Sequence, residues 1–134
     1  MTDALYHRDV MRLAADAVGH GRLAKPTSSA TVTNPLCGDR ITIDVEIDQG
    51  RIKSLSQESK ACLLCQAAAS MLARRAPGLT LAAVNEIKEA IEHDIATPPD
   101  TWPELAAFAP VADHKSRLRC VTLPFEALGR AAAG

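Results

Sequence analysis

The chain has 134 residues, the length of one ordinary domain, and 47% of them are hydrophobic, which is enough for a buried core. Lys and Arg (15) nearly balance Asp and Glu (16), and the net charge of −1 at pH 7 argues against a general nucleic-acid-binding protein. Aromatic residues make up only 3%, too few for stacking bases of single-stranded nucleic acid. No apolar run approaches the length of a membrane-spanning helix. We therefore expect neither a nucleic-acid nor a membrane partner.

The N-terminus shows no basic segment followed by an apolar one, so no secretory signal is visible and we expect a cytoplasmic protein. In the cytoplasm cysteines are kept reduced. The four cysteines of the chain are therefore expected to be free thiols available for chemistry, and not a disulfide framework.

The spacing of apolar residues predicts one helix, three strands and then further helices. Strict alternation over 40–48 is typical of a half-buried strand, and the apolar residues of the helical segments recur at helical spacing. The final helix contains Pro124, so it begins either near Thr122 or near Ser116 with a kink. The predicted helices are 3–17, 62–75, 80–93, 102–108 and 116–133, and the predicted strands are 30–33, 40–48 and 51–57. This order predicts an α+β fold with an N-terminal helix, a three-stranded antiparallel sheet and three to four C-terminal helices packed on one face.

Three of the four cysteines lie where one predicted element gives way to the next. Cys37 lies in an Asn-Pro-x-Cys-Gly-Asp turn, Cys62 at a strand-to-helix junction and Cys120 near the start of the last helix. Asp39 follows Cys37 by two residues, and the glycine between them lets both side chains face one centre. Three thiolates and one carboxylate form a tetrahedral set that suits Zn²⁺ or iron. The alternative, that these cysteines pack as small hydrophobic residues, fits Cys37 poorly because its turn is polar.

The fourth thiol, Cys65, completes a Cys-x-x-Cys spacing with Cys62. In an alanine-rich helix the simplest interpretation is a buried cysteine. The spacing also occurs in half of a zinc site, but the chain has no second such pair. A redox pair at a helix N-terminus, where the dipole lowers a thiol pKa, is a further interpretation. The antiparallel hairpin before the motif disfavours it, because a thioredoxin-like fold needs a βαβ frame.

Charged side chains surround Cys120 in the sequence. Arg117 and Arg119 flank it, and cationic neighbours favour a thiolate, which is both nucleophile and ligand. We predict that Arg117 stabilises a thiolate, although a solvated helix face is the alternative. His114 is near enough in sequence to reach a metal, but a loop histidine is the simpler interpretation. The chain carries no Gly-x-Ser-x-Gly elbow, phosphate-binding glycine loop or His-Glu-x-x-His motif.

These residues resemble those of the NifU/IscU-type iron–sulfur cluster assembly proteins. The resemblance rests on Asn-Pro-Leu-Cys-Gly-Asp-Arg at 34–40, on Cys62 with Ala-Ala-Ala-Ser-Met at 67–71, and on Arg-Leu-Arg-Cys-Val-Thr-Leu-Pro at 117–124. It covers nearly the whole chain, so we expect residues 1–134 to form a single NifU N-terminal/IscU-like domain. The resemblance implies a scaffold that receives sulfur as persulfide from a cysteine desulfurase and assembles a [2Fe–2S] cluster. The ligands it implies are Cys37, Asp39, Cys62 and Cys120.

Within this family the chain looks more like the SufU branch than the IscU branch. Arg119 stands where IscU-type chains carry a histidine, and Phe-Ala-Pro-Val-Ala at 108–112 replaces their Leu-Pro-Pro-Val-Lys chaperone-docking motif. The gap between Cys62 and Cys120 is long, as in SufU. The chain also departs from the family: Ser-Lys-Ala at 59–61 replaces glycines, and His-Gly-Arg at 20–22 is all that remains of the usual His-x-x-Asn-Pro-Arg-Asn.

Two functions therefore remain open. The first is a cluster scaffold that hands its cluster to apo iron–sulfur proteins. The second is a SufU-like zinc-dependent sulfurtransferase, in which Cys37 or Cys120 accepts persulfide sulfur from a SufS-type desulfurase by thiol exchange. Both favour a scaffold or sulfur acceptor over a stand-alone enzyme. A purely structural zinc module is disfavoured, because structural sites are usually all Cys and His and this one includes Asp39.

Overall fold

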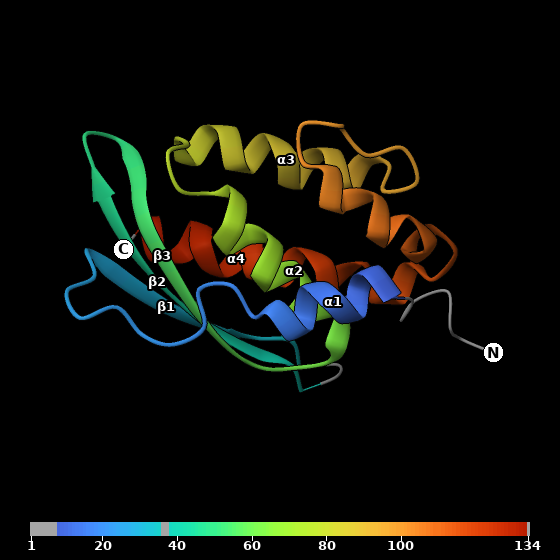
Figure 1. Cartoon of the computed structure of the whole chain (residues 1–134), viewed down its shortest axis with the longest axis horizontal. Coiled ribbons are helices and arrows are strands. Elements are labelled where there is room, and N and C mark those ends of the chain that lie inside the picture. Colours follow the sequence, from blue (N-terminus) through green and yellow to red (C-terminus); the bar gives the residue numbers. More distant parts are fainter. Residues whose placement is uncertain (1–7, 36–37, 134) are drawn as a thin grey trace.

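A computed structural model describes residues 8–35 and 38–133 of the chain. The elements are α1 (Arg8–Asp16), β1 (Ser28–Thr33), β2 (Arg40–Asp48), β3 (Arg51–Lys60), α2 (Leu63–Arg75), α3 (Leu81–His93), the 3-10 helices η2 (Pro103–Asp113) and η3 (Lys115–Arg117), and α4 (Leu118–Ala133). The three strands form one antiparallel sheet in the order β1-β2-β3. Figure 1 shows this twisted sheet at one side of the molecule and the helices gathered on its inner face.

The inner face of the sheet carries the alternating apolar residues predicted from the sequence. Ile41, Ile43 and Val45 of β2 are fully buried, and Ile52 of β3 is nearly so. Residues of a strand point to opposite faces in alternation, so these side chains share one face and define one wall of the core. The alternation over 40–48 is therefore confirmed as a half-buried strand.

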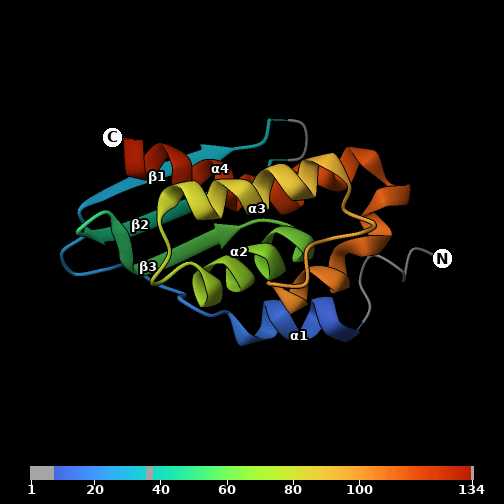
Figure 2. The ribbon, with the colours of Figure 1, turned by 90° about the horizontal axis from the view of Figure 1, so that it is seen from above.

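Two helices cover this face and two more lie outside them. α4 packs across β1 and β2, and α2 packs along β3. α1 packs on α2, while α3 lies against α4, as the view in Figure 2 shows. Among the residues described, no helix is both long and apolar enough to cross a membrane. The predicted α+β architecture, with the helices on one face of a three-stranded antiparallel sheet, is confirmed.

Several element boundaries differ from the prediction. β3 runs to Lys60, beyond the predicted end at residue 57, because its pairing with β2 continues to the pair Arg40 and Lys60. The predicted short helix 102–108 is a longer 3-10 segment, η2. The part of the predicted first helix before Arg8 lies outside the described residues.

The last helix begins at Leu118, close to the earlier of its two predicted starts, and Pro124 lies inside it. Proline has no amide hydrogen, and its ring crowds the carbonyl four residues before it. That carbonyl belongs to Cys120. The helical hydrogen bond between residues 124 and 120 is therefore missing from α4.

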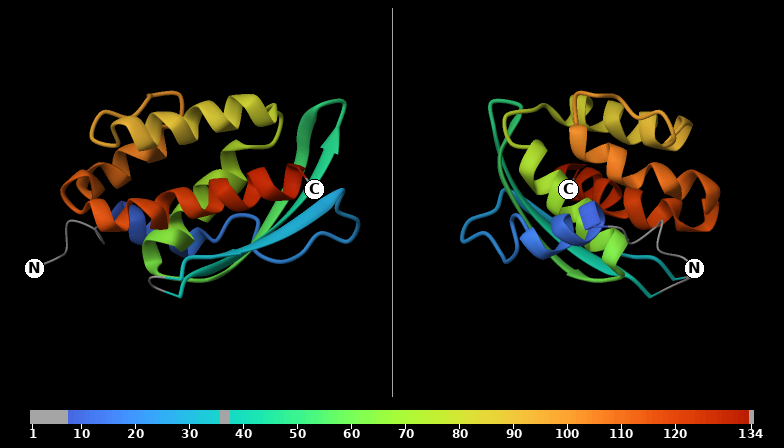
Figure 3. Two further views of the ribbon diagram at one scale, coloured as in Figure 1. Left: turned by 180° about the vertical axis from the view of Figure 1, so that it is seen from behind. Right: turned by 45° about the vertical axis from the view of Figure 1, so that its right-hand side comes forward.

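The outer face of the sheet is covered in part by the chain between α1 and β1, which passes behind the strands (Figure 3). Asp44 of β2 points to this face, yet its side chain is only 1% exposed. It accepts hydrogen bonds from Nε and Nη2 of Arg22 at 2.7 and 2.9 Å and from the amide of Leu23 at 3.0 Å. Ser29 also donates to it, at 2.5 Å. The hydrogen bonds from Arg22 are the main reason why the pKa of Asp44 falls to about 2.

Candidate metal centre

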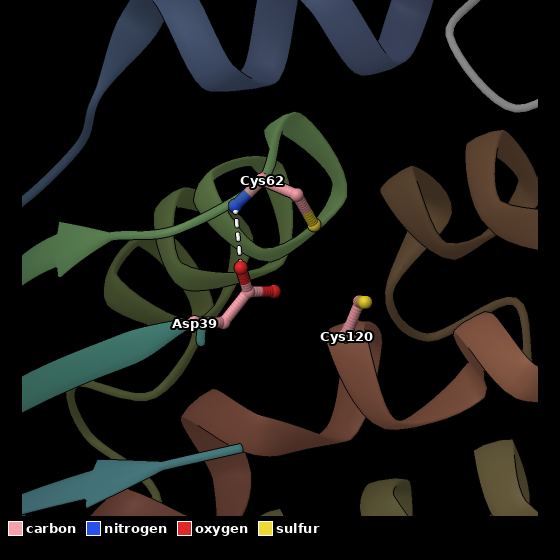
Figure 4. A group of neighbouring side chains, drawn as sticks. All are labelled: Asp39, Cys62 and Cys120. Carbon is pink, nitrogen blue, oxygen red and sulfur yellow. Dashed lines mark hydrogen bonds between the residues drawn. The ribbon is translucent and has the colours of Figure 1, made fainter. Parts of the chain in front are cut away.

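The strand pairing explains why residues distant in sequence meet at one end of the sheet. Asp39 directly precedes β2, and Cys62 follows the end of β3 as the N-cap of α2. Since β2 and β3 are antiparallel and pair Arg40 with Lys60, the start of one lies beside the end of the other. Cys120, in the first turn of α4, faces them from the helical layer (Figure 4).

The side chains of Asp39, Cys62 and Cys120 point into a common space. One ligand atom from each residue lies within 4.8 Å of the others. Figure 4 shows the two sulfurs and one carboxylate oxygen converging between the strand ends and α4. Of the four ligands that the sequence predicts, the structure brings these three together. Cys37 lies outside the described residues, so its place in the site stays a prediction.

The two oxygens of Asp39 have different surroundings. Oδ1 accepts a hydrogen bond from the backbone amide of Cys62 at 3.0 Å. Oδ2 is buried and has no hydrogen-bond partner among the described residues. A buried carboxylate oxygen without a partner is unfavourable, and buried polar atoms in folded proteins are almost always satisfied. The unsatisfied oxygen between two thiols therefore indicates a place for a cation.

The turn before Asp39 is closed by backbone hydrogen bonds at its two ends. The amide of Asn34 donates to the carbonyl of Asp39, and the amide of Gly38 donates to the carbonyl of Asn34, both at 2.8 Å. Gly38 has a φ of +77°, which glycine adopts without strain. Asp39 is thus held between a closed turn and a strand, which fixes its carboxylate against the start of α2.

The thiols of Cys62 and Cys120 form an asymmetric pair. A hydrogen bond from the Cys120 thiol is the main cause of a lowered pKa at Cys62. Burial and the Asp39 carboxylate oppose this shift, and the backbone amide of Cys65 and the cation of Arg117 add to it. The pKa of Cys120 is raised, first by its hydrogen bond to Cys62 and then by burial, and Arg117 opposes this. Cys62 is half-buried and Cys120 is 2% exposed. The pair therefore ionises first at Cys62, the more accessible sulfur.

The remaining predicted residues divide into those that act on the site and those that do not. Arg117 in η3 lowers the pKa of both cysteines, and its role as a thiolate stabiliser stays a prediction. Arg119 instead binds Glu126, at 3.3 Å. His114 is exposed between η2 and η3 and is absent from the group of ligand atoms found among the described residues. Cys65 is fully buried, as its packing interpretation expects.

One property of the site was not predicted from the sequence, namely that the lowered thiol pKa falls on Cys62. The prediction considered Cys37 and Cys120 as persulfide acceptors. The lowering of a thiol pKa by a helix N-terminus was considered only for a redox pair of Cys62 with Cys65, although the same dipole favours a thiolate at Cys62 itself. Cys62 is the N-cap of α2, with φ of −64° and ψ of 166°.

The donor set fits a metal ion or a cluster of the kind that the sequence predicts. Thiolates suit Zn²⁺ and iron, and Asp39 offers an oxygen that nothing else satisfies. The fold and the site together define a class of small α+β proteins. Proteins of this class have a centre of thiolates and a carboxylate at the end of a three-stranded sheet. The family of the NifU-like N-terminal domain matches residues 5–116, and the chain belongs to this family.

Individual relatives extend this similarity over most of the chain. This chain is 27% identical over 116 residues to the iron–sulfur cluster assembly scaffold protein IscU of Streptococcus pyogenes serotype M1. The aligned region covers 84% of this chain and 72% of that relative. The chain is 24% identical over 138 residues to the zinc-dependent sulfurtransferase SufU of Bacillus subtilis, covering 98% and 91%. The crystal structure of a nitrogen-fixing NifU-like protein (N-terminal) from Brucella abortus matches with a TM-score of 0.90 and 28% identity, covering 98% of this chain and 94% of that one. The resemblance found in the sequence is confirmed.

Proposed function

We propose that this chain is an iron–sulfur cluster assembly scaffold, which accepts sulfur from a cysteine desulfurase and builds or transfers a cluster. Iron and sulfur are then its cargo, and the residues that hold them are Cys37, Asp39, Cys62 and Cys120. The proposed partners are a SufS-like cysteine desulfurase and apo iron–sulfur proteins. The proposed compartment is the reducing cytoplasm, where the thiols stay free, and the proposed functional unit is residues 1–134.

The observation that carries this proposal is the unsatisfied oxygen of Asp39 beside two thiols. A purely structural zinc site is usually closed by Cys and His alone. Here a harder carboxylate oxygen replaces one soft ligand, and a mixed set is expected to hold a soft cluster less firmly than four thiolates would. Weak retention at one ligand suits a protein whose cargo must leave.

The residues of the chain divide the work of sulfur acceptance. Cys62 offers a thiolate at the half-buried edge of the site, and Cys120 keeps the proton of the pair. Arg117 lowers the pKa of both thiols and so stabilises the one that is deprotonated. When bound, iron or zinc supplies Lewis acidity that keeps the coordinating thiols deprotonated. The thiolate that receives sulfur attacks the outer sulfur of the donor persulfide, and the donor thiolate leaves with the bonding electron pair.

A second candidate, a zinc-dependent sulfurtransferase of the SufU kind, is favoured by two specific observations. The similarity to the SufU relative spans 98% of this chain, compared with 84% for the IscU relative. In addition, position 119 carries an arginine bound to Glu126, and so contributes no imidazole beside Cys120. In this alternative the same four residues hold zinc, and one thiolate is released to accept sulfur.

Anaerobic reconstitution separates the two candidates. The purified chain is mixed with a cysteine desulfurase, cysteine and Fe²⁺, while visible absorption and protein-bound zinc are followed together. Growth of a cluster chromophore that transfers to an apo acceptor supports the scaffold. Zinc that stays bound, with no chromophore and faster desulfurase turnover, supports the sulfurtransferase. A chain that produces neither result refutes both.

A further inference from the structure

The thiol of Cys65 belongs to the same helical turn as the candidate ligand Cys62. Cys62 is the N-cap of α2, and the amide of Gln66 donates to its carbonyl at 3.0 Å, which closes the first turn. Cys65 is the third helical residue. An N-cap side chain characteristically folds over the amides of the second and third residues. The Cys62 side chain makes no capping hydrogen bond, so its sulfur is not fixed to the amides of this turn.

This placement puts the two sulfurs in one turn of the chain, close enough in sequence for a bond between them. The Cβ atoms of residues three apart on a helix lie about 5–6 Å from one another. Disulfides join residues whose Cα atoms are about 4.4–6.8 Å apart. Cys62 has an extended N-cap backbone, and no capping hydrogen bond fixes its side chain, so Cys62 can turn toward Cys65. The bond also requires the two Cβ atoms to approach to about 3.5–4.5 Å.

Cys65 also stands apart from the metal centre. It is fully buried, and it is not part of the group formed by Asp39, Cys62 and Cys120. The chain has four cysteines. When the three predicted ligand cysteines hold metal, Cys65 is the cysteine that is not a metal ligand. Burial protects it from external oxidants and electrophiles, whereas a partner within its own helical turn can still reach it.

We propose that Cys65 is the resolving thiol of this centre, which releases sulfide from a persulfide carried by Cys62. The inference rests on the proposed function, because it takes sulfur acceptance for granted. Cys65 attacks the inner sulfur of the Cys62 persulfide, forming a Cys62–Cys65 disulfide. The bond between the inner and outer sulfurs breaks, and the outer sulfur leaves with that electron pair and the Cys65 proton as HS⁻.

The electrons of this step balance without any further reagent. The outer sulfur of a persulfide is two electrons short of sulfide, and the two cysteine sulfurs supply those electrons as they become a disulfide. Sulfide is the form of sulfur found in an iron–sulfur cluster. The Cys-x-x-Cys motif would therefore supply the reduction that converts delivered sulfur into cluster sulfur. An external dithiol is needed only to reset the pair for another turnover.

The test loads the full chain with sulfur without using a desulfurase. The protein is treated anaerobically with inorganic polysulfide and freed of excess reagent, and the released sulfide and the cysteine-containing tryptic peptides are then measured. Cys62 and Cys65 fall in one tryptic peptide, residues 61–74, whereas Cys120 falls in another. In the wild type we expect a disulfide within peptide 61–74 and one sulfide for each disulfide. In Cys65→Ala we expect the persulfide to persist on Cys62, with release slower by at least about tenfold.

Two further variants keep the result interpretable. Cys65→Ser retains nearly the full side-chain volume and should behave like Cys65→Ala. Leu64→Val disturbs the packing of the same turn but keeps the thiol, and should release sulfide at the wild-type rate. The proposal fails if Cys62 gains no sulfur, if Cys65→Ala releases sulfide as fast as the wild type, or if Cys62 is bridged to Cys120 instead. Since polysulfide bypasses the desulfurase, a chain that resolves its persulfide but takes no sulfur from any desulfurase would refute only the proposed function.

Discussion

One carboxylate oxygen of Asp39 accepts a hydrogen bond from the backbone amide of Cys62 at 3.0 Å, while its other oxygen is buried without a partner among the described residues. Asp39 therefore contacts both the start of α2 and the space between the thiols. The first contact supports the fold, and the second is available to a cation. Substitutions at Asp39 can separate the two.

Asp39→Asn and Asp39→Ala should differ in stability but agree in metal binding. Asparagine keeps an acceptor oxygen for the Cys62 amide, whereas alanine removes it and should destabilise the metal-free protein by about 1 kcal/mol. Both remove the anionic donor, so both should lose zinc faster to a chelator. Urea unfolding and chelator competition measure the two effects. Unchanged zinc release in both variants would remove Asp39 from the site.

Arg117→Leu should make Cys62 less reactive at neutral and mildly acidic pH. The pKa of Cys62 is lowered chiefly by the Cys120 thiol and further by Arg117. Only the thiolate is alkylated, so loss of the cation should move the pH midpoint of Cys62 alkylation upward in the metal-free protein. The matched control is Arg119→Leu, since Arg119 pairs with Glu126. Equal shifts in the two variants would indicate a general charge effect, and Arg117 would then have no specific role.

Acid should weaken the fold through Asp44. Its pKa is lowered from 3.8 to about 2, mainly by hydrogen bonds from Arg22. A carboxyl whose pKa is depressed in the folded state stabilises the protein above the unfolded pKa, and this stabilisation fades as pH falls from about 4 toward 2. The shift corresponds to at most about 2.5 kcal/mol.

Unfolding by urea at several pH values between 2 and 5 measures this loss in the metal-free protein. Asp44→Asn should be less stable than the wild type at pH 5 and should lose less stability as the pH falls. Asp48→Asn, an exposed substitution at the end of the same strand, is the control and should keep the wild-type acid dependence. An acid dependence that is unchanged in Asp44→Asn would contradict the assignment.

Gly19→Ala should destabilise the protein more than Gly50→Ala. Both glycines have nearly the same φ, +75° and +77°, so the backbone strain of an alanine is similar at the two sites. A Cβ at Gly19 would lie 2.7 Å from Cβ of Ala73 in α2, whereas one at Gly50 meets nothing within 4 Å. Overpacking of this kind typically adds about 1–3 kcal/mol. Thermal and urea unfolding compare the variants, and equal losses would show that α2 yields to the added methyl group.

The sequence predicted the fold well where a repeating pattern exists. Alternation over 40–48 located β2, and helical spacing located α2 and α3. The boundaries failed where a neighbouring segment decides them. The end of β3 at Lys60 depends on a partner in β2, and η2 is an 11-residue 3-10 segment, whose tighter winding a short apolar pattern does not distinguish from an α-helix.

The candidate site was predictable in its residue types but not in its asymmetry. The element-end positions of Cys62, Cys120 and Asp39 pointed to one centre, and the structure brings these three together. Which of the two thiols has the lower pKa depends on the burial of each sulfur and on the direction of the hydrogen bond between them. Neither can be derived from the spacing of the cysteines in the sequence. The burial of Asp44 was missed for the same reason, because Arg22 lies in a segment without a regular pattern.

Pro124 has a mechanical consequence for the centre. Because it offers no amide hydrogen to the carbonyl of Cys120, the first turn of α4 is joined to the rest of the helix by one hydrogen bond fewer. The remainder of α4 packs on β1 and β2 through its apolar face. A small displacement of Cys120, such as a ligand makes when cargo arrives or departs, can thus be absorbed within one turn, and the sheet and the body of the helix keep their positions.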